Sequence, residues 1–211
     1  YAKQLGFDGV ELHGAHGYII DEFFWEGTNQ RDDNYGGSLE KRTNFAADIT
    51  RAVRKVVGED YPILLRFSQW KQQDFTARLA HSPAELERFL KPLVDAGVDM
   101  FHCSTRRFWE PEFENDGSDM NLAGWTKKLS GKPTMTVGSV SLNADFITAF
   151  TKAGAETTGI DKLLEMLARG DFDLVAVGRA LIVNPDWPNK VRAGQMDQLK
   201  PYTPEALATL V

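Results

Sequence analysis

The sequence predicts an α/β fold, a (β/α)8 TIM barrel of which this chain supplies about five βα units. Short apolar, β-branched segments alternate with amphipathic helical segments, which is the pattern of a parallel sheet with helical crossovers. Residues that could carry chemistry end every expected strand. Barrels build their sites in this way, whereas a doubly wound sheet gathers its ligand at one switch point. No GxGxxG motif follows any expected strand, so the barrel is favoured.

The expected strands are short runs rich in Val, Ile, Leu and Phe. They are DGVELH (8–13), PILLRFS (62–68), DMFHCS (99–104), PTMTVG (133–138) and DLVAVG (173–178). A complete barrel usually takes about 250 residues and eight units. The 211 residues therefore predict a single TIM-barrel domain, 1–211, whose three N-terminal units are missing.

Capping signals bound the expected helices between these strands. Ser38 can cap a helix that runs to about Val57 before Gly58. Ser82 can cap the next helix, which has Pro83 at its first position, a capping-box glutamate and a glycine stop. Further helices are expected at 122–129, from about 143 to 153, at 161–168, near 188–193, and in a short segment that begins at 203.

The amino-acid composition limits the kinds of molecule that this protein is expected to bind. The net charge of −6 and the pI of about 5.3 argue against nucleic acid or an anionic membrane as the main partner. The single cysteine, Cys103, excludes an internal disulfide and an iron–sulfur cluster held by this chain's own thiolates. It fits a reducing, cytoplasmic location, and no apolar run approaches the ~20 residues of a membrane span. A homo-oligomer is a further possible assembly, which these numbers do not test.

The segment HGAHGY follows the first expected strand and holds His13, His16 and Tyr18. Period-two alternation directs His13 into the barrel lumen, near the mouth of the site. The favoured interpretation is a pair of imidazole donors aimed at a substrate oxygen. Two alternatives stay open: hydrogen-bonded structural histidines, and a zinc site with His102 and Cys103 as further candidate ligands.

Two other groups of strand-end residues suggest a bound anion. Arg66 ends an apolar strand and is expected to face inward toward an anion or an electron-rich ring. Gly138 and Ser139 end the fourth expected strand, and Gly178 and Arg179 end the fifth. Glycine lets backbone N–H groups approach a phosphate closely, and an arginine adds a bidentate contact. The last two strands of a barrel are where this fold usually binds phosphate.

These motifs together resemble the Old Yellow Enzyme family of FMN-dependent ene-reductases, over essentially the whole chain. The resemblance rests on HGAHGYIIDEF, on N-x-R-x-D-x-YGGS-x-E-x-R from Asn29 to Arg42, on LRFS, and on DLVAVGRALIVNPDW. It implies FMN as cofactor and NADPH or NADH as reductant. It also implies a small electrophilic alkene as substrate, an α,β-unsaturated carbonyl or a nitro compound.

The resemblance also implies roles for individual residues. His13 and His16 would hydrogen-bond the carbonyl or nitro oxygen of the substrate, and Tyr18 would be the proton donor. Arg66 would sit against the pyrimidine edge of the flavin. The FMN phosphate would be held by Gly138, Ser139, Gly178 and Arg179.

The segment 106–125, RRFWEPEFENDGSDMNLAGW, is long for a loop in a compact domain. Because it leaves the catalytic end of the barrel, we expect it to fold over the site, with Phe108 and Trp109 shaping the substrate pocket. The acidic run inside it favours a solvated insertion as the alternative.

Two other functions compete with the ene-reductase interpretation. One is a dienoyl-CoA reductase-like or trimethylamine dehydrogenase-like flavoenzyme on the same barrel, although such proteins carry a cysteine cluster after the barrel. The other is a catalytically silent barrel fragment that does not bind FMN. The charged residues Arg31, Asp32 and Asp33 are interpreted as ion-paired loop residues rather than as a catalytic cluster.

Overall fold

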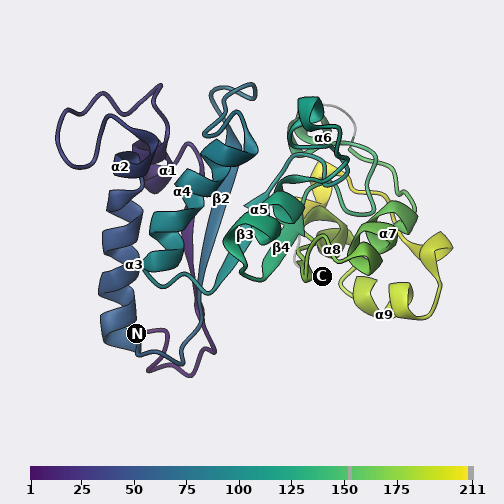
Figure 1. Cartoon of the computed structure of the whole chain (residues 1–211). Helices are drawn as coiled ribbons and strands as arrows, with labels where there is room; N and C mark the ends of the chain where they lie inside the picture. The colour runs from purple at the N-terminus through teal and green to yellow at the C-terminus, as the bar shows by residue number, and fades with distance from the viewer. Residues whose placement is uncertain (152–153, 209–211) are drawn as a thin grey trace.

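The computed structural model describes residues 1–151 and 154–208, and its centre is a parallel sheet of five strands in sequence order (Figure 1). The strands are β1 (Val10–His16), β2 (Ile63–Lys71), β3 (Met100–Ser104), β4 (Thr134–Val137) and β5 (Leu174–Val175). Each strand pairs in parallel with the next one along the chain. A doubly wound sheet would reverse its strand order at a switch point. The sequential order therefore confirms an arc of a TIM barrel.

Helices follow each strand and cover the outer face of the arc. They are α1 (Ile19–Phe24), α2 (Leu39–Arg42), α3 (Asn44–Val57), α4 (Pro83–Asp95), α5 (Leu122–Ser130), α6 (Phe146–Thr151), α7 (Asp161–Arg169), α8 (Arg179–Val183) and α9 (Trp187–Arg192). Three 3-10 turns, 114–116, 196–198 and 204–208, complete the described elements. Figure 1 shows α3 and α4 side by side along the β1–β2 part of the sheet. None of these helices is long and apolar enough to cross a membrane.

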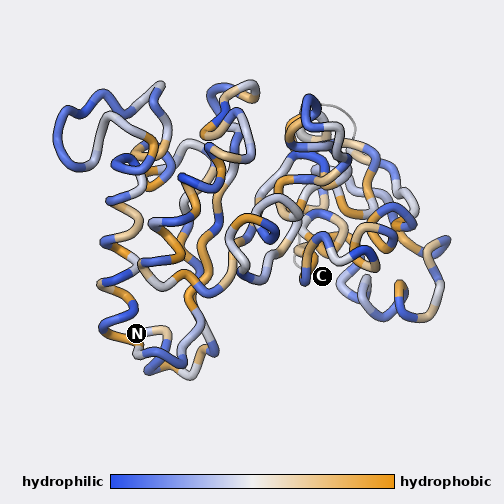
Figure 2. The backbone as a smooth tube through the Cα atoms, in the orientation of Figure 1, coloured by the Kyte–Doolittle hydropathy of each residue, from blue (hydrophilic) through white to orange (hydrophobic). Residues whose placement is uncertain are grey.

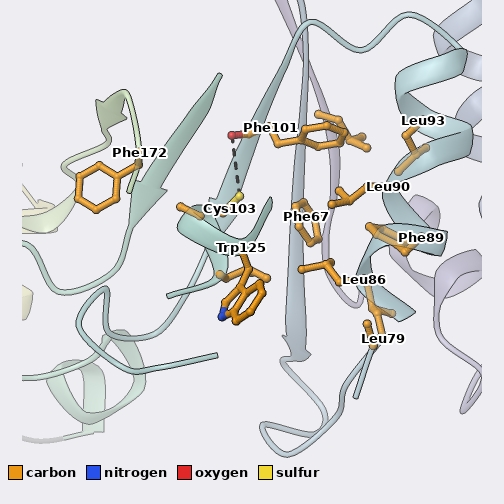
Figure 3. Packing of buried hydrophobic residues seen from close by; sticks show 14 of the residues in the cluster. Phe67, Leu79, Leu86, Phe89, Leu90, Leu93, Phe101, Cys103, Trp125 and Phe172 are labelled. Carbon is orange, nitrogen blue, oxygen red and sulfur yellow. Dashed lines mark hydrogen bonds between the residues drawn. The ribbon is translucent and has the colours of Figure 1, made fainter. Parts of the chain in front are cut away.

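The core lies between the outer face of the sheet and the helices. Leu65 and Phe67 of β2 are fully buried, whereas the alternating Leu64 and Arg66 are only half-buried on the inner face. Phe89 of α4 packs against this layer, with its ring tilted relative to that of Phe67 and the two centroids 5.3 Å apart (Figure 3). Period-two burial of this kind directs every second residue of β2 toward the barrel lumen.

The expected helix caps are present, but the glutamate of the expected capping box accepts from a different backbone N–H. The hydroxyl oxygens of Ser38 and Ser82 accept hydrogen bonds from backbone N–H groups three residues later, and Pro83 begins α4. The Glu85 carboxylate accepts from the His81 N–H at 2.7 Å, one residue before the N-cap that a capping box would use. The stops at Gly58, Gly97, Gly131 and Gly170 all have positive φ, which glycine adopts without steric cost.

Several element boundaries differ from the predictions. β1 continues to His16 and β2 to Lys71, so HGAH belongs to a strand rather than to the loop after it. The pairing shifts between Gly14 and His16, because β2 carries extra residues opposite them. Such bulges bend a strand and redirect its side chains. β5 keeps only two residues, and the helix expected over 38–57 is divided at Thr43.

The helix expected over 143–153 begins only at Phe146, and its expected end lies outside the described residues. The loop between α1 and α2 is strongly hydrophilic (Figure 2). Within it the Arg31 guanidinium pairs with the exposed Asp33 carboxylate, with Nε 3.0 Å from Oδ1. This confirms the interpretation for Arg31 and Asp33, whereas no ion pair of Asp32 is found among the described residues.

Candidate active site

A cavity of about 380 Å³ lies at the carboxyl ends of the strands. Six of the eight predicted catalytic and cofactor-binding residues line it: His16, Arg66, Gly138, Ser139, Gly178 and Arg179. The other two, His13 and Tyr18, are beside it. The His13 ring lies 5.4 Å from the His16 ring and 5.3 Å from the Tyr18 ring, between centroids. The fold therefore brings together residues separated by more than 160 positions in the sequence.

His16 has a strained and tightly held backbone. Its φ is 67°, in the left-handed region that non-glycine residues rarely adopt, and Gly17 follows with φ 82°. Side-chain acceptors take both N–H groups of this turn. The Ser68 hydroxyl accepts from His16 at 2.9 Å, and the Asp21 carboxylate accepts from Gly17 at 2.7 Å.

Asp21 is itself held by Lys71 in a fully buried ion pair. The Lys71 Nζ lies 2.8 Å from Asp21 Oδ1, and both side chains have no exposed surface. Burial raises the pKa of Asp21 to about 6 and lowers the pKa of Lys71, and in each case the partner's charge opposes this effect. Breaking a buried pair by removing one partner costs about 3–5 kcal/mol. The pair therefore fixes the turn that carries His16 and Tyr18.

The imidazoles of the site are held neutral. Burial, followed by the charge of Arg66, lowers the pKa of His16 to about 3, and the same two causes lower the pKa of His13. The His16 ring also stacks on Trp70, with centroids 4.5 Å apart. A neutral imidazole offers one N–H donor and one acceptor nitrogen, so each histidine can donate one hydrogen bond to a ligand oxygen.

Arg66 is a cation without a carboxylate partner. Its Nη2 donates to the Ser104 hydroxyl at 3.1 Å, and its buried Nε has no hydrogen-bond partner in the part of the chain that the structure describes. No carboxylate within residues 1–151 and 154–208 forms an ion pair with it. Burial lowers the pKa of Arg66, and the charge of Glu11 opposes this effect. A desolvated guanidinium in this state favours a nearby negative charge. Arg66 faces the lumen, as predicted.

The ends of β4 and β5 present backbone donors to the cavity. The N–H groups of Gly138, Ser139 and Gly178 have no acceptor in the described part of the chain. A Cβ on Gly138, where φ is 140°, would lie 2.7 Å from the Thr105 carbonyl oxygen, so glycine is required there by a chain contact. A Cβ on Gly178 would meet nothing within 4 Å, so this glycine leaves open space beside the cavity.

Arg179 also has no carboxylate partner among the described residues. Its guanidinium donates to the carbonyl oxygens of Ala144 at 2.8 Å and Asp145 at 3.2 Å, and it lies over the Tyr202 ring. The Ser139 hydroxyl lies 3.4 Å from it. Two of its nitrogens are thus already engaged with the chain, but its positive charge remains available to an anion at the cavity.

Phe108 and Trp109 do not line the cavity, which differs from the expected lid. Phe108 is only 4% exposed and belongs to the hydrophobic core, and Trp109 packs against that core. Both backbone polar groups of Phe108 are hydrogen-bonded. Its N–H donates to the Gly138 carbonyl, and its carbonyl accepts from the Asn121 side-chain amide. Because these rings pack in and against the hydrophobic core, the start of the 106–125 segment is anchored to the rest of the domain. Their role in a substrate pocket remains a prediction that this placement does not support.

The sequence did not predict three residues that shape the site: Trp70, Asp21 and Lys71. Ser104 counts among the residues expected to carry chemistry at the end of a strand, but its position alone assigned it no role. SQWKQQD reads as a polar loop, although the structure continues β2 through it. The residues described include no group of three or more His, Cys, Asp or Glu side chains able to hold a metal ion. His102 instead pairs with Glu11, with Nδ1 2.8 Å from Oε2, and Cys103 is buried.

The sequence profile of the NADH:flavin oxidoreductase / NADH oxidase family matches residues 1–198. The chain belongs to this family. It is 37% identical to the NADH oxidase of Thermoanaerobacter brockii over 94% of this chain and 28% of that protein. It is 33% identical to 12-oxophytodienoate reductase 2 of Arabidopsis thaliana over 90% of this chain and 45% of that protein.

A comparison with a solved structure agrees with this family membership. The Old Yellow Enzyme homologue from Zymomonas mobilis superposes with a TM-score of 0.72 at 25% identity, and the match covers 100% of this chain and 52% of that chain. The chain therefore resembles part of an Old Yellow Enzyme barrel. It spans about a quarter to a half of the length of these relatives.

Proposed function

We propose that the protein is an FMN-dependent oxidoreductase that passes a hydride from NADH or NADPH to activated alkenes, such as α,β-unsaturated carbonyl and nitro compounds. One arrangement carries the proposal. Two neutral imidazoles and a phenol, His13, His16 and Tyr18, lie side by side at the rim of a cavity. The same cavity is lined by Arg66, whose guanidinium forms no ion pair among the described residues. Family membership supports flavin-dependent oxidoreduction, and this geometry supports the finer assignment.

The donors around the cavity fit FMN. The unpartnered N–H groups of Gly138, Ser139 and Gly178, with the charge of Arg179 close by, would hold the phosphate. The unpartnered Nε of Arg66 would face the pyrimidine edge of the ring system. Every one of these groups is a donor or a cation, as an anionic cofactor requires.

FMN, when bound, supplies the hydride that reaches the β-carbon of the alkene. The residues of this chain would stabilise the negative charge that develops on the substrate and would donate the proton. Negative charge develops on the substrate oxygen, and N–H groups of His13 and His16 stabilise it. The α-carbon then needs a proton, which the Tyr18 hydroxyl gives. Tyr18 is suited to this, because it is 52% exposed and its oxygen accepts a hydrogen bond from the Gln72 amide at 3.2 Å.

Replacement of Tyr18 by phenylalanine tests the proton-transfer role. We expect Tyr18→Phe to slow reduction of an enone by about 10²–10⁴-fold, the usual contribution of a positioned general acid. Reduction of the bound flavin by NADH or NADPH needs no such proton and should be unchanged. Stopped-flow measurement of the two half-reactions separates them.

Tyr35→Phe is the matched control, because this second phenol lies in the loop between α1 and α2, donates to Asp48 of α3 and does not line the cavity. Equal enone reduction by the Tyr18 variant and the Tyr35 control would assign the proton to another group.

A further inference from the structure

Ser104 lies between two groups of the proposed site. Its Oγ is 2.7 Å from His16 Nε2 and 3.1 Å from Arg66 Nη2, and the residue is only 2% exposed. The pairing register explains the contact with Arg66. Arg66 of β2 lies opposite His102 of β3, and Ser104 is the next residue of β3 on the same face.

The polarity of these hydrogen bonds follows from the chemistry of the partners. A guanidinium can only donate, so the Ser104 oxygen accepts from Arg66. Its own O–H proton then needs an acceptor, and His16 Nε2 is the acceptor that the described residues place within reach of this hydroxyl. If Nε2 carried the proton instead, the nearly buried hydroxyl proton would have no partner. Such an unmade bond is costly.

We infer that Ser104, polarised by Arg66, fixes the tautomer of His16 with the proton on Nδ1. Nδ1 has no partner among the residues described, and His16 lines the cavity, so Nδ1–H is the donor available to a ligand there. Free histidine favours the opposite tautomer, with its proton on Nε2. Ser104 is thus a positioning residue that selects which nitrogen of His16 donates. The link to substrate rests on the proposed ene-reductase function, whereas the tautomer itself does not.

The tautomer is measured directly by ¹⁵N NMR of the histidine-labelled protein near pH 7, where the two ring nitrogens of a neutral imidazole have well-separated shifts. The chain has four histidines, and the signals lost in His16→Gln identify those of His16. We expect the Nδ1–H form in the wild type and in Ser104→Thr, which keeps the hydroxyl. We expect a shift toward the Nε2–H form in Ser104→Ala.

Ser130→Ala is the matched control, because this hydroxyl bonds the Thr126 carbonyl at the end of α5 and should leave His16 unchanged. In the same variants, kcat/KM for an enone should fall at least tenfold in Ser104→Ala and recover in Ser104→Thr.

An Nε2–H tautomer in the wild type, or an unchanged tautomer in Ser104→Ala, would overturn the inference. Failure of the proposed function has a different signature: no enone is reduced by any variant, while the tautomer still follows the Ser104 hydroxyl.

Discussion

Alanine at His13 or at His16 should lower kcat/KM for enone reduction by about 10²–10³-fold, because loss of one preorganised donor to a developing oxyanion costs about 3–4 kcal/mol. The two rings lie together at the rim of the cavity and are held neutral by burial and by Arg66. Each therefore contributes an N–H rather than a charge. The same variants should bind a para-substituted phenol more weakly, which titration of the flavin spectrum measures.

The matched control for these variants is His81→Ala, which removes an exposed histidine from the loop before α4. Reduction of the flavin by NADH or NADPH should be less affected in the His13 and His16 variants than enone reduction. A uniform loss of both half-reactions would point to a disturbed fold. Stoichiometric zinc in the wild type that is lost with either histidine would contradict the assignment and restore the metal-site alternative.

Replacement of Arg66 by methionine should lower the midpoint potential of the bound flavin by about 30–65 mV. Reduced flavin carries negative charge on its pyrimidine ring, and a hydrogen bond to a charged group contributes about 1.5–3 kcal/mol. For a two-electron couple, about 30 mV corresponds to 1.4 kcal/mol. Arg66 suits this role because, within the described structure, its buried Nε has no hydrogen-bond partner and no carboxylate lies within ion-pair distance of its guanidinium.

Arg66→Lys separates charge from geometry. Lysine keeps the positive charge but not the planar fork of donors, so its potential should lie between those of the wild type and Arg66→Met. A spectroelectrochemical titration with a reference dye gives all three values. An unchanged potential in Arg66→Met would show that this side chain does not contact the flavin ring.

Much of the fold could be predicted because the signals were local. The strands were recognisable from apolar runs of the right length, and the caps at Ser38 and Ser82 from their hydroxyls. The strand-end rule for barrels was enough to bring residues as distant as His16 and Arg179 to one cavity.

The parts that could not be predicted depend on contacts between distant residues. Lys71 looks like a surface residue, but β2 continues past Ser68 and buries it in an ion pair with Asp21, 50 residues earlier. The position of Phe108 depends in the same way on tertiary packing. An aromatic residue in a long loop can cover a site or enter the core, and here the core accommodates it. The tautomer of His16 depends on Ser104, which lies 88 residues away.

The central claim is that this segment, within its complete protein, holds FMN in the cavity at the ends of its strands. The most direct measurement is reconstitution of the apoprotein of the full-length chain with FMN, followed by gel filtration and anaerobic addition of NADH or NADPH. We predict a yellow protein with one FMN per chain that bleaches with at least one of the two nicotinamides and regains its colour with an enone. A protein that leaves the column colourless would contradict the account and favour a silent barrel.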